Sequence, residues 1–331
     1  MSSILVFGAT CIDYIAQVSH FPQLDEKLRT NSLTICVGGN ASNTATCMSR
    51  LGIKLKLLTK ISNDSNGEKI LKNYQEEKNI DTSLIVIQSS LTTPLSYVIV
   101  DLESKTRTCL YSANNEQIFV NEINPNCLDK INFIHFDSNS LEAAVELAKL
   151  AKDKAITCSF DLERDEPFLN QLIPLMNYII TTENYSQNVC KDSSLIQTAI
   201  RLLQTCQFVI ITRGKNGSIL VEKINKKLFN PIENTNSQGS IVTQEIIHIN
   251  EEDFLIWNCT AWPIQSEDII DTTGSGDAFT GAIIYGLLTK EFWSRDKLLR
   301  FASYIAMCKL KGIGACSSLP YISDIDMNLF S

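Results

Sequence analysis

The sequence predicts a three-layer α/β fold, in which a mostly parallel central sheet is flanked by helices and carries a small β-sheet lid. Three observations lead to this fold class. Strand-like apolar runs alternate with amphipathic helical stretches along most of the chain. Two long stretches rich in β-branched and aromatic residues interrupt the alternation. A glycine-rich turn opens an apolar helix late in the chain.

The first strand and helices lie in the N-terminal part of the chain. An apolar run over 4–7 is expected as a strand. We expect a helix over 41–51, ended by Gly52 as its C′ residue, and a second helix from Asn66 through Lys78. These elements would begin the alternation of strands and helices.

The middle of the chain gives the clearest alternation. A strand over 131–136 precedes a helix whose apolar stripe begins at Leu141, and a strand over 156–160 follows. The unit then repeats as a strand, a helix and a strand over 178–181, 193–205 and 208–212. Parallel strands joined by helices are the expected result.

Three stretches depart from this pattern. Residues 14–36 and 84–111 carry turn signals and no helical periodicity, so we expect antiparallel hairpins that stand apart from the main sheet and act as a lid over a site at its edge. Residues 223–265 combine an Asn-rich interval with an acidic, aromatic patch, and we interpret them as a surface insertion. The whole chain, 1–331, is expected to form one domain.

Composition excludes several classes of partner. The chain has 29 Lys and Arg against 37 Asp and Glu, a net charge of -8, and no long basic block, which argues against nucleic acid or a membrane surface as the main partner. Eleven cysteines without a CxxC pair indicate reduced thiols. With no basic leader segment and no apolar run long enough to cross a bilayer, the expected location is cytoplasmic.

The run from Asp271 to Asp277, DTTGSGD, is the most informative motif. Apolar residues recur every four positions after it, so a helix begins at or just after the glycines. Backbone amides of Gly274, Ser275 and Gly276 would then converge at the positive end of the helix and form an anion hole for phosphate. Asp277, in the first turn, could accept a proton from an attacking hydroxyl.

Two other nucleotide-binding motifs are excluded. The sequence contains no G-x-x-x-x-G-K-[ST] phosphate loop. The dinucleotide fingerprint fails because Phe279 occupies its third glycine position.

The segment DTTGSGDAFTGA resembles the C-terminal signature of the PfkB, or ribokinase-like, carbohydrate kinase family, usually written DTxGAGD, with Ser275 in place of alanine. Other motifs follow in the family order. GATCID at 8–13 resembles its first strand, and VGGNASN at 37–43 resembles its GGxxxN motif. The remaining matches lie at 63–67 with 79–82, at 212–217 and at 312–320. The resemblance covers nearly the whole chain and is closest to ketohexokinase and ribokinase types.

This resemblance implies ATP-dependent phosphorylation of a hydroxyl on a sugar or sugar-like molecule of ketohexose or ribose type, with Asp277 as the base. It implies a sugar site made by Asp13, Gly39, Asn40 and Asn43. Arg107 matches an arginine that, in ketohexokinase-like members, reaches the transferred phosphate. The implied nucleotide site consists of Asn184, Thr212, Arg213, Gly214, Gly217 and Gly314.

The resemblance also implies two cations. Asp271, Thr273 and Ser318, with the backbone near Gly314, resemble the family's monovalent-cation loop and suggest K⁺. Mg²⁺ is expected with ATP, but Gln187 stands where the family's N-x-x-E motif has glutamate, so either weaker magnesium binding or binding that relies on other groups is expected. Three scattered histidines do not suggest a zinc site.

Several alternatives stay open. Capping and turn chemistry would equally explain the Asp and Asn of the sugar site, a solvated side chain would explain Arg107, and ordinary loop hydrogen bonds would explain Asp271. The acceptor could be a nucleoside or a sugar phosphate, or the chain could be a catalytically weak homologue that binds ligand, which Gln187 favours. The failed fingerprint argues against a nicotinamide-dependent reductase. Exposed lid strands predict a homodimer.

Overall fold

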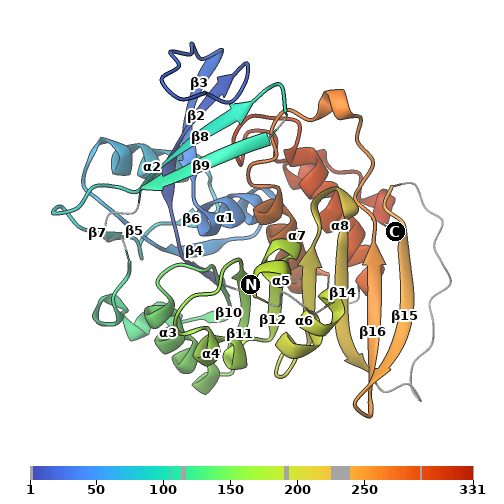
Figure 1. The fold of residues 1–331 in the computed structure, drawn as a ribbon. Coiled ribbons are helices and arrows are strands. Elements are labelled where there is room, and N and C mark those ends of the chain that lie inside the picture. The colour runs from blue at the N-terminus through green and yellow to red at the C-terminus, as the bar shows by residue number, and fades with distance from the viewer. Residues whose placement is uncertain are drawn as a thin grey trace.

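The computed structural model describes residues 3–104, 106–112, 117–189, 194–224, 239–290 and 293–330. Within these ranges, ten strands form one large sheet and four strands form a small separate sheet (Figure 1). Two further short strands, β5 (Lys60–Ile61) and β7 (Val86–Ile87), pair in parallel. The predicted fold class is confirmed.

Seven neighbouring strands of the large sheet are parallel, in the order β6, β4, β1, β10, β11, β12, β13. Their bounds are β1 Ser3–Phe7, β4 Leu55–Leu58, β6 Ile80–Asp81, β10 Ile131–Phe136, β11 Thr157–Leu162, β12 Tyr178–Thr182 and β13 Phe208–Thr212. Every strand predicted from the apolar runs is among them. Parallel order requires crossover connections, which the helices supply.

Three antiparallel strands complete the large sheet at the β13 edge: β14 (Ser218–Ile224), β16 (Glu252–Cys259) and β15 (Val242–Ile249). Residues 242–249 and 252–259 of the stretch interpreted as a surface insertion, 223–265, are therefore strands of the large sheet. The run from Phe254 to Trp257 is buried because its side chains point alternately to the two faces of the sheet and pack into the core on each side. The Asn-rich part of that expectation, 225–238, lies outside the described residues.

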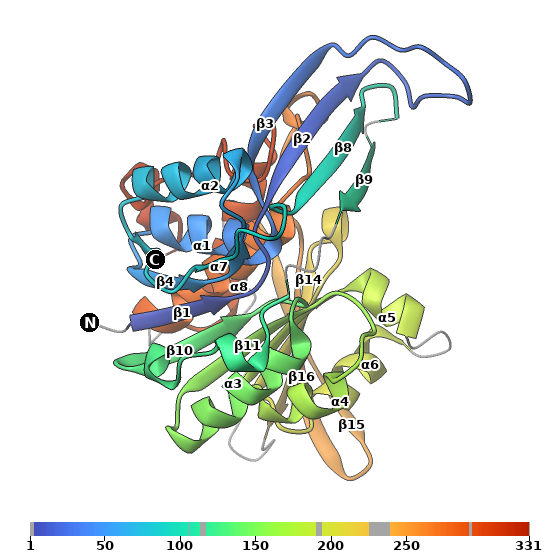
Figure 2. The same cartoon turned by 90° about the vertical axis from the view of Figure 1, so that its left-hand side faces the viewer.

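Helices cover both faces of the large sheet (Figure 2). One face carries α1 (Asn40–Arg50), α2 (Ser65–Glu76), α7 (Ser275–Thr289) and α8 (Arg295–Lys309). The other carries α3 (Leu141–Asp153), α4 (Leu169–Leu172), α5 (Glu183–Val189) and α6 (Leu195–Leu202). Successive side chains of β1 point to opposite faces of the sheet. Ile4 and Val6 therefore pack against the first group of helices, and Leu5 and Phe7 pack against the second.

The small sheet has the order β3, β2, β8, β9. Its strands are β2 (Cys11–Val18), β3 (Ser32–Gly38), β8 (Leu95–Asp101) and β9 (Thr106–Ser112). Two antiparallel pairs were expected and are present, but β2 and β8, which run in the same direction, join them in parallel (Figure 2). Residues 84–94 do not join this sheet, since β7 pairs with β5 instead.

None of the helices in the described ranges has the length and apolar character needed to cross a membrane.

Candidate active site

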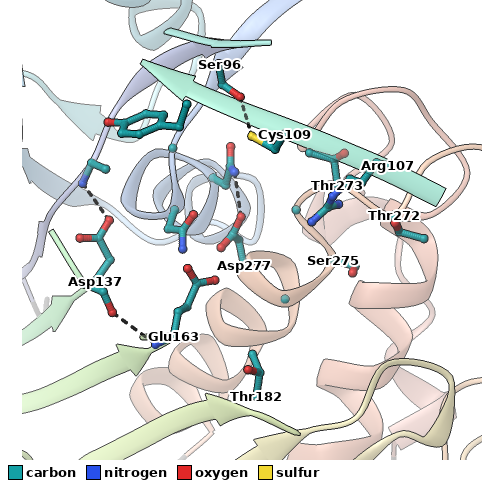
Figure 3. A pocket seen from close by; sticks show the side chains of 18 of the residues that line it. Ser96, Arg107, Cys109, Asp137, Glu163, Thr182, Thr272, Thr273, Ser275 and Asp277 are labelled. Carbon is teal, nitrogen blue, oxygen red and sulfur yellow. Dashed lines mark hydrogen bonds between the residues drawn. The ribbon is translucent and has the colours of Figure 1, made fainter. Parts of the chain in front are cut away.

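A cavity of about 710 Å³ opens where the parallel strands end. Residues at or just beyond the carboxyl ends of five strands line it: Ala9 after β1, Asp137 after β10, Glu163 after β11, Thr182 at the end of β12 and Arg213 after β13. In open α/β sheets this edge is where ligands bind. The small sheet and the start of α7 supply the other walls (Figure 3).

The glycine-rich turn forms the start of α7, as predicted. Gly274 is the N-cap residue and has a φ of 76°, and a Cβ at this position would lie 2.5 Å from the Cβ of Ala315. Gly276 differs, since a Cβ there would meet no atom within 4 Å and would point into open space. Because Gly274, Ser275 and Gly276 all line the cavity, the positive end of α7 faces it.

Asp277 is buried in the first turn of α7 and lines the same cavity. The amide Nδ2 of Asn43, from α1, donates a hydrogen bond of 2.7 Å to its Oδ2 (dashed at Asp277 in Figure 3). Burial and the nearby charge of Glu163 raise the pKa of Asp277 to about 7, although the Asn43 bond and Arg107 oppose the shift. A carboxylate with a pKa near neutrality is suited to accept a proton at physiological pH.

The small sheet turns one face toward the cavity. Alternate residues on its strands line it: Cys11, Asp13, Ser96, Val98, Arg107, Cys109 and Tyr111. Asp13 is buried, and its burial raises the pKa of the carboxyl group, while the thiol of Cys11 and the charge of Arg107 lower it. A Cβ on Gly38 would lie 2.1 Å from the Asp13 carboxylate, so a side chain at that position would displace it.

The GGN motif brings α1 to the cavity. Gly39 caps the helix with a φ of 95°, and a Cβ there would lie 2.5 Å from the backbone oxygen of Ala9. Gly39, Asn40 and Asn43 all line the cavity. The sequence-predicted sugar-site residues therefore meet the glycine-rich turn at one place.

Asp137 is a cavity residue that the motif search missed. Its carboxylate accepts backbone hydrogen bonds from Ala9 at 2.8 Å, Ala41 at 3.1 Å and Asn139 at 2.9 Å. Burial raises its pKa to about 6 against these bonds. The carboxylate ties the end of β1 to the start of α1. The sequence signal that could have identified Asp137 is a polar residue directly after a predicted parallel strand. Glu163, directly after β11, shows the same signal.

The expected nucleotide loop lies on the far wall of the cavity. Thr212, Arg213 and Gly214 line it, as does Asn184 at the start of α5. Gly217 does not line it. The backbone oxygen of Gly217 accepts a hydrogen bond of 2.7 Å from the Arg213 amide, and a Cβ on Gly217 would lie 1.9 Å from the Cys259 oxygen. This glycine shapes the loop.

Gln187 is exposed and does not line the cavity, whereas Glu183 and Glu163 do. Oxygen donors of the kind that magnesium prefers are thus present on the cavity wall. In the described part of the chain, no three His, Cys, Asp or Glu side chains gather closely enough to hold a metal by themselves.

The side chain of Lys309, at the end of α8, contacts the loop expected to hold a monovalent cation. The carboxylate of Asp271 accepts hydrogen bonds from Thr273 (amide 2.9 Å, hydroxyl 2.7 Å) and from the Gly314 amide (2.8 Å). The Lys309 Nζ donates to the backbone oxygen of Asp271 at 2.6 Å, and the Ser318 hydroxyl donates to the Lys309 oxygen at 2.6 Å. Of these residues only Thr273 lines the cavity, so Gly314 does not.

Asp271 and Lys309 each shift the pKa of the other toward its charged form. Burial would raise the pKa of Asp271, but Lys309 and the hydrogen bonds outweigh it and lower the value. Burial lowers the pKa of Lys309 to about 8, with Asp271 opposing that shift. The ammonium, which bonds the backbone oxygen of Asp271, and the Asp271 carboxylate therefore favour each other's charged forms beside the glycine-rich turn.

Comparison with known families decides the identity. The model of the pfkB family carbohydrate kinase matches residues 1–239 and 258–322. The chain belongs to the pfkB family of carbohydrate kinases. Its enzyme class is therefore that of a kinase. Between the two matched ranges, residues 240–257 of this pfkB-family chain contain β15 and most of β16.

Two curated relatives of this pfkB-family chain illustrate its similarity. It is 23% identical over 350 residues to a ribokinase from Dictyostelium discoideum, covering 98% of the chain and 99% of the relative. It is 23% identical over 320 residues to a ketohexokinase from Mus musculus, covering 93% and 97%. Both alignments span nearly the full length of the pfkB-family domain.

Solved structures share the fold. A ribokinase from Arabidopsis thaliana complexed with ribose and ATP superposes with a TM-score of 0.76 at 16% identity, covering 100% of this chain and 99% of that one. A nucleoside kinase from Burkholderia thailandensis in complex with inosine gives a TM-score of 0.74 at 16% identity, covering 98% and 96%. The pfkB-family chain thus has a ribokinase-like fold.

Proposed function

We propose that this chain transfers the γ-phosphoryl group of ATP to a hydroxyl of a sugar or sugar-like molecule, of ketohexose or ribose type. The observation that carries the proposal is the 2.7 Å hydrogen bond between Asn43 and Asp277. It joins the expected sugar side of the cavity to the start of α7, where phosphate is expected to bind. A phosphoryl acceptor and donor must meet at such a point.

The chemistry follows from the residues around that bond. Asp13, Asn40 and Asn43 offer fixed donors and acceptors for the hydroxyls of a polyol, and Arg107 faces the same space. Asp277 would orient the reacting hydroxyl and accept its proton. The amides at the start of α7 would stabilise charge on the transferred group, which passes through a loose transition state that needs positioning more than early deprotonation.

ATP would lie along Thr212 to Gly214, next to Asn184. Its magnesium would be held by the phosphates together with oxygen atoms of Glu163, Glu183 and Asn184, which fit a hard cation, and would neutralise phosphate charge. Glu183 thus supplies a carboxylate that Gln187 lacks. Its presence on the cavity wall supports an active kinase over the catalytically weak, ligand-binding homologue that Gln187 favours.

A nucleoside or a sugar phosphate is the alternative acceptor. The first is supported by the nucleoside kinase that shares this fold. The second is supported by Arg107 and Arg164, two of the three arginines that line the cavity, which could pair with an acceptor phosphate. The small sheet, in either case, would act as a lid over the acceptor.

A coupled assay of ADP release over ribose, fructose, tagatose, inositol, nucleosides and sugar phosphates tests the proposal. We expect release that depends on one acceptor class and is lost in Asp277→Asn. Asp153→Asn, an exposed aspartate at the end of α3, is the matched control. ATP·Mg that raises the melting temperature without any acceptor-dependent release would support the ligand-binding homologue instead, and a shift with NADPH alone would support a reductase.

Two further proposals concern the state of the protein. The ten cysteines in the described residues are all free thiols, which supports a cytoplasmic location.

We also propose a homodimer formed through the outer face of the small sheet. Leu33, Ile35, Tyr97 and Leu110 are between 45% and 60% exposed on that face. A second copy of the same sheet would cover them.

A further inference from the structure

Lys309 is a fully buried cation at the end of α8. The side chain is 0% exposed, and its Nζ donates hydrogen bonds to the backbone oxygens of Asp271 at 2.6 Å and of Gly312 at 3.2 Å. A buried ammonium is stable only when carbonyl or carboxylate oxygens replace its water. Here the replacement comes from main-chain carbonyls, the ligand type that also suits an alkali cation.

The two carbonyls belong to different loops that close around the ammonium. The first loop leads from Asp271 into α7, and the second follows α8 and passes Gly312 and Ser318. The space is tightly packed, since a Cβ on Gly312 would lie 2.4 Å from the Ser317 hydroxyl and 2.9 Å from the Ser318 Cβ. The Ser318 hydroxyl already donates its hydrogen bond to the backbone oxygen of Lys309.

Through Asp271, this ammonium holds in place the glycine-rich turn that is proposed to bind phosphate. The carboxylate of Asp271 holds the amide and hydroxyl of Thr273 at 2.9 and 2.7 Å, and Gly274 follows directly as the cap of α7. The same carboxylate holds the Gly314 amide at 2.8 Å. Fixing both loops through one cation therefore fixes where the amides of the turn point.

The K⁺ expected from the sequence does not fit this arrangement. A potassium ion at Asp271 and Ser318 would need the carbonyl oxygens that the Lys309 ammonium already binds. The ammonium carries the same charge as K⁺, is compact, and has three N–H groups that can donate to such oxygens. Two cations in one packed space would repel each other.

We propose that Lys309 is a positioning residue that serves as a built-in monovalent cation, so that the kinase works without K⁺. The proposal rests on the kinase function proposed above. A lysine that only completes the C-terminus of a helix is the competing explanation. The two explanations differ in one respect, because only a cation substitute can be replaced by added K⁺ once the lysine is gone.

The first experiment uses the wild-type chain. We expect its ADP-release rate and its melting temperature to be the same in KCl as in choline chloride at equal ionic strength. A several-fold rate increase, or a melting-temperature increase, that is specific to KCl would overturn the proposal. The melting readout decides even if no acceptor is phosphorylated, so failure of the kinase proposal is seen separately.

The second experiment uses Lys309→Ala, with Lys309→Met as a variant that better fills the space and exposed Lys311→Ala as the matched control. Without K⁺ we expect Lys309→Ala to lose about tenfold or more in kcat/KM, the size of effect expected for a buried charged hydrogen bond. Excess KCl should restore much of the rate and raise the melting temperature of this variant, and choline chloride should do neither. Lys311→Ala should behave as wild type.

Two outcomes would overturn the proposal. One is a Lys309→Ala variant that keeps full activity without K⁺. The other is a variant whose rate and melting temperature fall equally in KCl and choline chloride, with Lys309→Met behaving alike, since a purely structural lysine gives that result.

Discussion

Asp277 shows how burial can make an ordinary carboxyl group useful. It lies in the first turn of α7, where the helix would favour its anion, yet burial and Glu163 raise its pKa to about 7. The Asn43 amide at 2.7 Å fixes the direction of one carboxylate oxygen. The group is therefore oriented and only partly ionised at neutral pH in the free protein.

The pH dependence of catalysis follows from this pKa. A base must be unprotonated, so kcat/KM should rise with pH through about 7 and then level off, since kcat/KM reports the free enzyme. A series of initial rates with the active acceptor from pH 5 to pH 9 measures this. A profile that is already flat above pH 5 would show that no group with a raised pKa controls the step.

The same shift predicts an effect on stability. The folded-state pKa is above the unfolded value, so the stabilisation is fully present below about pH 4 and is lost as pH rises through about 7. Asp277→Asn cannot ionise, so at pH 8 it should be more stable than wild type, by up to about 4 kcal/mol. Urea unfolding at pH 5 and pH 8, with Asp153→Asn as control, checks it. An Asn variant that is less stable than wild type at pH 8 would contradict the assigned environment.

At the scale of elements, the start of α7 separates two kinds of glycine. Gly274 has a φ of 76° and no room for a Cβ beside Ala315, so Gly274→Ala should cost about 1–3 kcal/mol of stability. Gly276 has open space, so Gly276→Ala should fold at least as stably as wild type.

Gly276→Ala should nevertheless lower kcat/KM for ATP, because its methyl group would occupy space proposed for phosphate. Thermal melts and ATP kinetics on both variants check this pair. Unchanged kinetics in a stable Gly276→Ala variant would move the phosphate site away from this turn.

The sequence was most informative where periodicity is local. Strands at 131–136 and 208–212 were predicted at their observed bounds, and the start of α7 followed from the glycines. The strand β16 was missed because a strand buried on both faces shows no alternation, and the polar stretch before it resembled a surface loop. The parallel pairing of β2 with β8 depends on contacts between distant segments, which no local pattern encodes.

For the site, motifs indicated residues that converge on one cavity, including Asp13, Asn43 and Asp277. They did not indicate Asp137, whose position after a strand is informative only once the sheet order is known. Lys309 could not be predicted, since nothing in a lysine at a helix end shows that its side chain turns inward to bind two loops.

At the scale of the whole molecule, the small sheet has two different faces. Its inner face carries Asp13 and Arg107 into the cavity. On its outer face, Ile35, Tyr14, Tyr97 and Leu110 are paired across all four strands in one row. The rings of Tyr14 and Tyr97 lie 5.6 Å apart. One sheet could thus cover the acceptor and join two subunits.

This row predicts the oligomeric state. Light-scattering chromatography should give the mass of a dimer at micromolar concentration, and Leu110→Lys combined with Ile35→Lys should give a monomer, because each change places a charge in the proposed interface. Leu24→Lys, at a residue 98% exposed outside this row, is the matched control and should stay dimeric. Wild type that elutes at monomer mass would reject the dimer.

In the proposed mechanism, Asp277 takes the proton of a hydroxyl that attacks ATP in this cavity. Single-turnover transfer from γ-labelled ATP to the active acceptor tests it most directly, with binding of ATP and acceptor measured in parallel. We expect Asp277→Asn to bind both ligands but to transfer phosphate more slowly by about a hundredfold or more, while Asp153→Asn should match wild type. Transfer at the wild-type rate in Asp277→Asn would contradict it.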